Sequence, residues 1–258
     1  EGGTAITSHD DPELVADALP FSLLLNESLL TSVPKHERLL TATCGQYTQY
    51  SVGFLQVDAE AAQFDDYERS KHLSDRALRL ALRGRGYCLR ALEICFPGVS
   101  SRLTADPATA VPQARKEHVP LLYWSAASLG SAVSLGGLDR PDLLIKWPVI
   151  RALAERALAL DPAWSRGALH ELMITVESQG EALGGSEERA RAHFAVDRLP
   201  HRRVVRECRE ERSGPWRIHA RRTDQHHGKP GGVLLERRCH LRDGQPHHQV
   251  WRQQPARH

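Results

Sequence analysis

The stretch that decides the fold is Val149–Pro162, which reads VIRALAERALALDP. Its small and apolar residues recur every three or four positions, which is the period of one face of an α-helix. The stretch ends on an Asp-Pro pair, and a proline after a helix prevents that helix from continuing. The residues of the pattern are Ile150, Ala154, Ala157, Leu160 and Pro162. The pattern predicts an amphipathic helix with one buried face and a defined end.

The same helical period extends outward from this stretch over most of the chain. Up to about residue 195 no convincing run of alternating β-branched residues appears, so we predict an all-α body. Pro20 is expected to kink or restart the first helix, and the Trp147-Pro148 pair to break the fifth. The predicted helices cover about residues 10–34, 37–56, 66–95, 119–135, 141–160 and 165–177, and a last helix follows residues 184–186.

The prolines that end helices suggest a repeat. Pro34, Pro97 and Pro162 are separated by 63 and 65 residues, close to twice the period of about 34 residues in a tetratricopeptide (TPR) repeat. The spacing within Val149–Pro162 also matches the second helix of such a repeat. These observations favour an α-solenoid of TPR-like helical hairpins over a compact four-helix bundle.

The composition changes near Pro200. Residues 1–200 hold 20 Lys+Arg against 26 Asp+Glu, whereas residues 201–258 hold 14 against 6 together with 8 of the 14 histidines. We therefore predict a helical domain over residues 10–199 and a basic His/Arg-rich tail over residues 200–258 that is disordered or poorly ordered. The abrupt excess of Arg, His, Gln, Pro and Gly is typical of a GC-rich coding sequence read in a shifted frame. A metal-binding or nucleic-acid-binding tail is the alternative, but its His and Cys spacings match no closed zinc pattern.

The overall composition excludes several protein classes. A hydrophobic share of 41% and a charged share of 26% exclude a wholly disordered chain, a collagen-like fibre and a polytopic membrane protein. No apolar run reaches the roughly eighteen residues of a spanning helix, so we expect none. Five cysteines are too few, and odd in number, for a disulfide-stapled fold. Cys44, Cys88 and Cys95 lie in apolar helical patterns and are interpreted as small core residues.

His170 and Glu177 lie seven residues apart on one predicted helix and therefore share a face. The His170-Glu171 pair resembles the start of a zinc-protease motif, but Ile174 stands where the second histidine is needed. We assign no metal ligand and no cofactor. A structural polar pair is the simplest interpretation of His170 and Glu177. The alternative function is an α-helical enzyme that uses this pair with an arginine as an anion clamp.

Two glycines, Gly84 and Gly86, lie among Arg83, Arg85 and Arg90. A phosphate-binding loop needs a strand before the glycines and a helix start at them. These glycines instead lie inside a long helical pattern, so we expect them to allow close packing against a neighbouring helix. The arginines are expected to bridge carboxylates, and the alternative is that one of them binds an acidic solute.

Five segments of the chain together form a recognisable pattern over about residues 10–195. The segments are Asp10–Leu30 (DDPELVADALPFSLLLNESLL), Ala81–Gly98 (ALRGRGYCLRALEICFPG), Val119–Leu135 (VPLLYWSAASLGSAVSL), Val149–Pro162 (VIRALAERALALDP) and Gly167–Glu177 (GALHELMITVE). The most distinctive parts are Arg-Gly-Arg-Gly-Tyr in the second segment and Leu-Leu-Tyr-Trp in the third. In this order and at these separations, the segments resemble the T-component family of tripartite ATP-independent periplasmic (TRAP) transporter systems, which are TatT-like lipoproteins.

The resemblance implies a non-enzymatic TPR-like protein in the periplasm that binds a periplasmic solute-binding protein. It also implies a lipid anchor, a homotrimer around a central pore, and an apolar or organic-acid ligand. We expect no nucleic acid as a partner. The family's lipobox cysteine is absent from this sequence, so the anchor is inferred. After residues 193–194 the family continues with further helices, where this chain begins its basic tail. Candidate ligand- or partner-binding residues are Arg85, Tyr87, Arg90, Tyr123, Trp124, His170 and Glu177.

Overall fold

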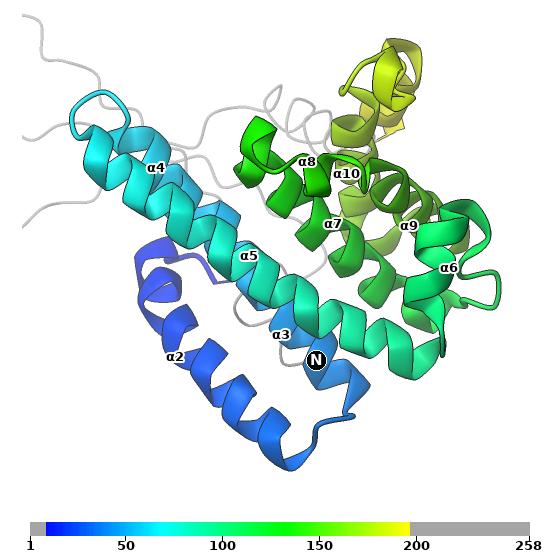
Figure 1. The fold of residues 1–258 in the computed structure, drawn as a ribbon, viewed down its shortest axis with the longest axis horizontal. Helices are drawn as coiled ribbons and strands as arrows, with labels where there is room; N and C mark the ends of the chain where they lie inside the picture. The colour runs from blue at the N-terminus through cyan, green and yellow to red at the C-terminus, as the bar shows by residue number, and fades with distance from the viewer. Residues whose placement is uncertain (1–8, 197–258) are drawn as a thin grey trace, which may run out of the picture. The chain divides into compact units, whose positions relative to one another are not determined.

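The computed structural model describes residues 9–196 of the chain (Figure 1). Within these residues every regular element is helical and there is no strand, which confirms the predicted all-α class. The prediction of a disordered tail over residues 200–258 lies outside the described residues.

The first helix, α2, spans Pro12–Ser32. It begins at Asp11, whose carboxylate accepts hydrogen bonds from the first free backbone N–H groups and so caps the helix. Of the two outcomes predicted at Pro20, a kink or a restart, the restart is wrong, because α2 continues through that residue. Leu19 and Leu23 on either side of the proline are both buried. Their packing holds the helix together across the missing backbone hydrogen bond.

The next two helices form a long hairpin. α3 (Glu37–Tyr50) passes through a π-helical turn, η1 (Ser51–Gln56), into α4 (Val57–Ala62). The helical stretch therefore ends at residue 62 and not at the predicted residue 56. After a turn, α5 (Tyr67–Cys95) runs back along α3 and α4 (Figure 1). The Ser70 hydroxyl donates to the Ala59 carbonyl over 2.7 Å and ties the turn together.

Shorter helices complete the described chain, and the predicted break before Trp147 separates α8 from α9. The elements after α5 are α6 (Val99–Ala105), η2 (Pro107–Thr109), η3 (Lys116–His118), α7 (Val119–Gly136), η4 (Gly137–Asp139), α8 (Pro141–Leu144), α9 (Trp147–Leu160), η5 (Trp164–Gly167), α10 (Ala168–Glu177), η6 (Glu181–Leu183) and a helix over residues 187–196.

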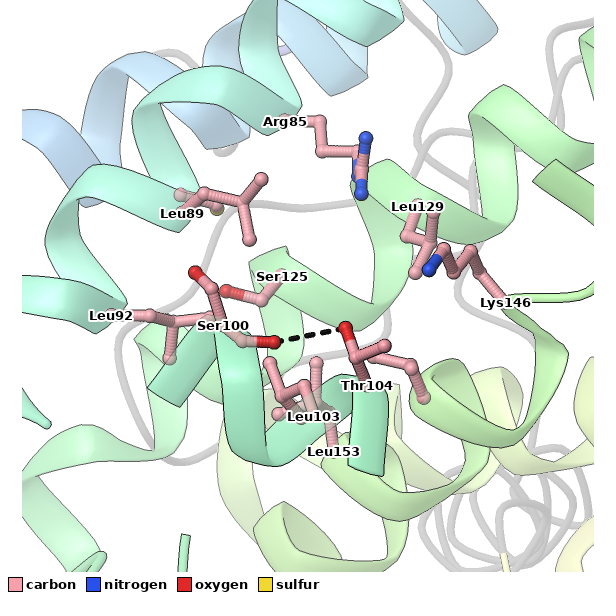
Figure 2. Close-up of a pocket in the computed structure, with 12 residues that line it drawn as sticks. Arg85, Leu89, Leu92, Ser100, Leu103, Thr104, Ser125, Leu129, Lys146 and Leu153 are labelled. Carbon is pink, nitrogen blue, oxygen red and sulfur yellow. Dashed lines mark hydrogen bonds between the residues drawn. The ribbon is translucent and has the colours of Figure 1, made fainter. Parts of the chain in front are cut away.

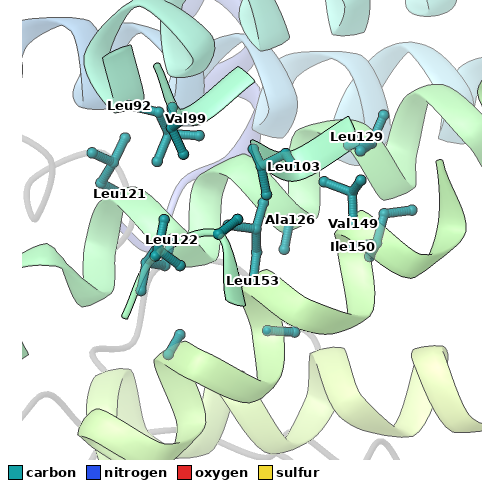
Figure 3. Packing of buried hydrophobic residues seen from close by; sticks show 14 of the residues in the cluster. Leu92, Val99, Leu103, Leu121, Leu122, Ala126, Leu129, Val149, Ile150 and Leu153 are labelled. Atoms are coloured by element: carbon teal, nitrogen blue, oxygen red, sulfur yellow. The ribbon is translucent and has the colours of Figure 1, made fainter. Parts of the chain in front are cut away.

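Helices that follow one another in the sequence also pack on one another. α2 packs on α3, α3 on α5, α5 on α7, α7 on α9 and α9 on α10. The largest core lies between α5, α6, α7 and α9, where leucine and valine side chains interdigitate (Figure 3). This order of packing is what stacked helical hairpins predict, while the TPR-like repeat itself stays a prediction.

One of the two glycines of α5 has the predicted packing role. A Cβ atom at Gly84 would lie 2.6 Å from the Cβ of Tyr47 and 3.3 Å from the carbonyl oxygen of Cys44, both on α3. Only glycine therefore fits this crossing of α3 and α5. The same prediction is wrong for Gly86, where an added Cβ would meet nothing within 4 Å because the residue lies on the exposed side of α5.

A disulfide joins Cys44 of α3 to Cys88 of α5. Both cysteines are fully buried in the core, as predicted, but their interpretation as separate small residues is wrong. The close approach of α3 and α5 at Gly84 brings the two Cα atoms to 5.5 Å, within the range that a disulfide needs. Cys95 is a free thiol.

Two helical segments are long and apolar enough, by length and composition, to cross a membrane: Pro12–Ser32 and Lys116–Asp139. We expected none, because a few polar residues interrupt both segments and neither contains an unbroken apolar run of spanning length. Half of the apolar stretch in Lys116–Asp139 is buried, as in the core helix of a soluble protein. Only 17% of the corresponding stretch in α2 is buried. α2 therefore presents an apolar face that the described helices leave uncovered.

Candidate functional site

A pocket of about 120 Å³ lies between α5, α6, α7 and α9. Figure 2 shows Arg85 of α5 and Lys146, which precedes α9, reaching into this pocket with their charged ends. The remaining wall is mainly aliphatic. The aliphatic residues are Leu89, Leu92, Leu103, Leu129, Val149 and Leu153. The arrangement combines an apolar interior with two positive charges, as in sites that orient a ligand by a few polar groups.

The two cations of the pocket lack hydrogen-bonded acids among residues 9–196. Burial lowers the pKa of Arg85, and the more distant Asp142 only partly opposes this effect. The Asp142 carboxylate is itself held by Arg140, through two hydrogen bonds of 2.9 and 2.8 Å. A half-buried guanidinium normally pairs with a carboxylate, so Arg85 retains unused hydrogen-bonding capacity.

The pocket wall also contains an unsatisfied hydroxyl. Ser125 of α7 is only 5% exposed, and its Oγ has no hydrogen-bond partner within the described part of the chain. Thr104, on the same wall, instead donates to the carbonyl of Ser100 over 3.0 Å (Figure 2). Because buried hydroxyls in folded proteins nearly always have a partner, the Ser125 hydroxyl indicates a place for a polar atom that residues 9–196 do not supply.

Of the predicted candidate residues, only Arg85 lines this pocket. Tyr123 and Trp124 instead form a half-buried aromatic cluster with Trp164 of η5. The ring centroid of Tyr123 lies 4.9 Å from that of Trp124 and 4.7 Å from that of Trp164. Trp124 also covers Gly45, where an added Cβ would lie 2.8 Å from the indole ring. Burial raises the pKa of Tyr123.

Tyr87 and Arg90 belong to a network that fastens α2 to the hairpin. The hydroxyls of Tyr87 and Tyr47 donate to the Glu27 carboxylate over 2.8 and 2.5 Å, and Arg83 forms an ion pair with the same carboxylate. The hydrogen bond from Arg83 is the main reason that the pKa of Glu27 falls to about 2. The guanidinium of Arg90 lies 5.5 Å from the ring centroid of Tyr87. These side chains are engaged inside the fold.

His170 and Glu177 hydrogen-bond to different partners. The Nδ1 atom of His170 lies 3.0 Å from that of His193, and burial lowers the pKa of His193. The Glu177 carboxylate accepts hydrogen bonds from Arg151 at 2.7 Å, Arg189 at 2.8 Å and a backbone N–H at 3.0 Å. Burial opposes ionisation, but the two arginines lower the pKa of Glu177. The convergent His170/Glu177 pair that the enzyme alternative requires is absent from these contacts.

Sequence reasoning missed Lys146 and Ser125. Lys146 precedes the Trp147-Pro148 break, and only the fold brings it within one pocket of Arg85, which is 61 positions earlier in the chain. Ser125 stands in an apolar helix between Trp124 and Ala126, where a small residue is ordinarily read as a packing residue. A polar side chain on the buried face of such a helix is the signal that could have identified it.

Comparison with known families agrees with the fold. Residues 8–198 match the model of the TRAP transporter T-component family. The chain belongs to that family. This confirms the resemblance found in the sequence.

One relative of this T-component protein is an uncharacterized protein of Treponema pallidum (strain Nichols). The two are 29% identical over 195 residues, which is 73% of this chain and 59% of the relative. The T-component chain thus spans about three-fifths of the length of that relative.

Proposed function

We propose that this protein is a non-enzymatic component of a periplasmic TRAP-type solute uptake system that binds a solute-binding protein and holds an organic ligand. The observation that carries the proposal is the family match, which covers residues 8–198 and thus all the described helices. The pocket beside Arg85 supports ligand binding.

The disulfide between Cys44 and Cys88 supports the periplasmic location. Disulfides persist in oxidising compartments, including the bacterial periplasm, and are rare in the reducing cytosol. The family, in turn, favours a protein held at the membrane by a lipid anchor. We include this anchor in the proposal.

The outer face of α2 is the surface that we propose for the solute-binding protein. Leu19, Leu23 and Leu30 bury its inner face. Phe21 is 70% exposed and Leu25 is 47% exposed on the opposite face. A helix that is apolar all round is normally buried on all sides, and contiguous exposed apolar area marks interaction sites. A protein partner from the same transport system would cover this face.

A pull-down followed by light scattering tests this proposal. The protein is mixed at micromolar concentration and low salt with the solute-binding protein of the same TRAP system. We expect a stable complex, and Phe21→Glu with Leu25→Glu should abolish it. Leu138→Glu, at an apolar position that is 89% exposed outside α2, is the matched control and should leave the complex intact.

Three results would count against the proposal. Absence of any complex would overturn partner binding. A complex unaffected by the α2 substitutions would move the contact to another surface. If the substitutions instead abolish self-association, the α2 face belongs to a contact between copies of this chain, and the same light-scattering data then test the proposed homotrimer.

A further inference from the structure

We propose that the pocket between α5, α6, α7 and α9 binds a small organic carboxylate, with the acid group at Arg85 and Lys146 and the apolar part among the leucines. This inference deepens the ligand-holding part of the proposed function and rests on it. It does not require the partner protein.

The charge and donors of the pocket favour an anion. Arg85 and Lys146 come from different parts of the chain, and both reach into the pocket with their charged ends (Figure 2). Neither cation hydrogen-bonds to a carboxylate among the described residues, and the Asp142 carboxylate is held by Arg140. A carboxylate offers two oxygens and about four acceptor sites, and a guanidinium can fill two of these with parallel hydrogen bonds. An anionic ligand therefore supplies the acceptors that the described chain does not.

The Ser125 hydroxyl is a second, independent observation. It is 95% buried, lines the same pocket and lacks a partner among the described residues. Leaving such a group unsatisfied is unfavourable, whereas a ligand oxygen within reach would supply the missing partner. A purely apolar ligand would leave the hydroxyl, as well as the two cations, without acceptors.

The volume limits the size of the apolar part. An engineered cavity of about 150 Å³ in another protein holds one benzene molecule, and this pocket is slightly smaller, at about 120 Å³. The apolar part of the ligand is therefore limited to about the size of one six-membered ring, with the acid group beside Arg85 and Lys146. Leu89, Leu103 and Leu129 provide the apolar contacts for such a group. A long acyl chain does not fit within this volume.

The fold itself does not need Arg85. Arg83, two residues earlier on α5, is paired with Glu27, and Arg90 donates to the Pro34 carbonyl over 3.0 Å. Arg85 is half-buried without a comparable hydrogen bond, so burying it costs free energy that the described contacts do not return. Replacing it with an apolar side chain should leave stability unchanged or raise it, which is typical of a residue kept for binding.

Titration of the full-length protein with four probes tests the proposal. Sodium benzoate supplies the ring and the acid, benzamide the ring without the charge, acetate the acid without the ring, and inorganic phosphate an anion of another geometry. Calorimetry gives the affinities, and methyl resonances of Leu103 and Leu129 report the place of binding. We expect benzoate to bind at least tenfold more tightly than the other three probes, with shifts at these methyl groups.

Arg85→Met should remove the preference for benzoate over benzamide while leaving the thermal midpoint equal or higher. Arg79→Met, which removes an exposed arginine of α5 outside the pocket, is the matched control and should behave as the wild type. If Arg85→Met does not fold, Lys146→Met should weaken benzoate binding in the same direction.

The proposal is overturned if benzoate does not bind below about 10 mM or binds no better than benzamide. It is also overturned if phosphate binds more tightly than benzoate, or if the variants retain the preference. These measurements use the isolated protein, so their failure is distinguishable from failure of the complex with the solute-binding protein.

Discussion

Glu27 offers the sharpest test of how α2 is held on the hairpin. Its carboxylate accepts hydrogen bonds from the hydroxyls of Tyr47 and Tyr87 and from the guanidinium of Arg83. Its side chain is only 17% exposed. The pKa of Glu27 falls from 4.5 to about 2, chiefly through the hydrogen bond from Arg83. One pKa unit corresponds to about 1.4 kcal/mol. The ionised form therefore stabilises the folded protein by about 3 kcal/mol at neutral pH.

The sign of the pH dependence follows from the lowered pKa of Glu27. The stabilisation is fully present above the unfolded pKa of 4.5 and is lost as the pH falls towards the folded value of about 2. Glu27→Gln should lower the free energy of unfolding at pH 7 by about 2 kcal/mol, since glutamine keeps neutral hydrogen bonds. The deficit relative to the wild type should shrink as the pH falls from 5 to 2.

Urea unfolding followed by circular dichroism at several pH values measures this difference. Asp75→Asn is the control, because Asp75 is an exposed carboxylate on α5 without a hydrogen bond in the described part of the chain. It should leave the pH profile parallel to that of the wild type. If the Glu27→Gln profile is also parallel, the carboxylate does not carry the attachment of α2, and our account of this network is wrong.

Four further variants test the packing. Replacing Cys44 and Cys88 with alanine removes a bridge between residues 44 positions apart and should cost about 4 kcal/mol in urea unfolding; a reducing agent should destabilise the wild type but not the variant. Gly84→Ala should lower the thermal midpoint, at a cost of about 1–3 kcal/mol from overpacking, while Gly86→Ala, into open space, should stabilise by up to about 1 kcal/mol. Glu177→Ala removes the acceptor that Arg151 and Arg189 share and should cost about 1–3 kcal/mol; an unchanged urea midpoint would refute this estimate.

The helices were predictable because their signals are local. The apolar period of Val149–Pro162 and the Trp147-Pro148 break concern neighbouring residues, and both predictions are confirmed. The continuation of α2 through Pro20 was not predictable in this way. It depends on Leu19 and Leu23 finding a buried surface on another helix, and tertiary packing of this kind overrides the local preference of proline.

The disulfide and the pocket could not be predicted from the sequence, for the same physical reason. Cys44 and Cys88 look like ordinary small apolar residues until Gly84 allows α3 and α5 to approach. Arg85 and Lys146 belong to one site only because α5 and the start of α9 line the same space. Single residues could be selected by chemical type, as Arg85 was, but their partners come from other helices and are set by the fold.

The Arg-Gly-Arg-Gly-Tyr sequence contains two arginines whose different roles the local sequence does not predict. Arg83 and Arg85 are alike in sequence, yet two positions along an α-helix are rotated by about 200°, so the two side chains leave α5 on opposite sides. Arg83 meets Glu27 of α2 and holds the fold together. Arg85 lines the pocket beside α7 and has no hydrogen-bonded carboxylate among the described residues. The same short sequence thus gives α5 one structural face and one face that is left for a ligand.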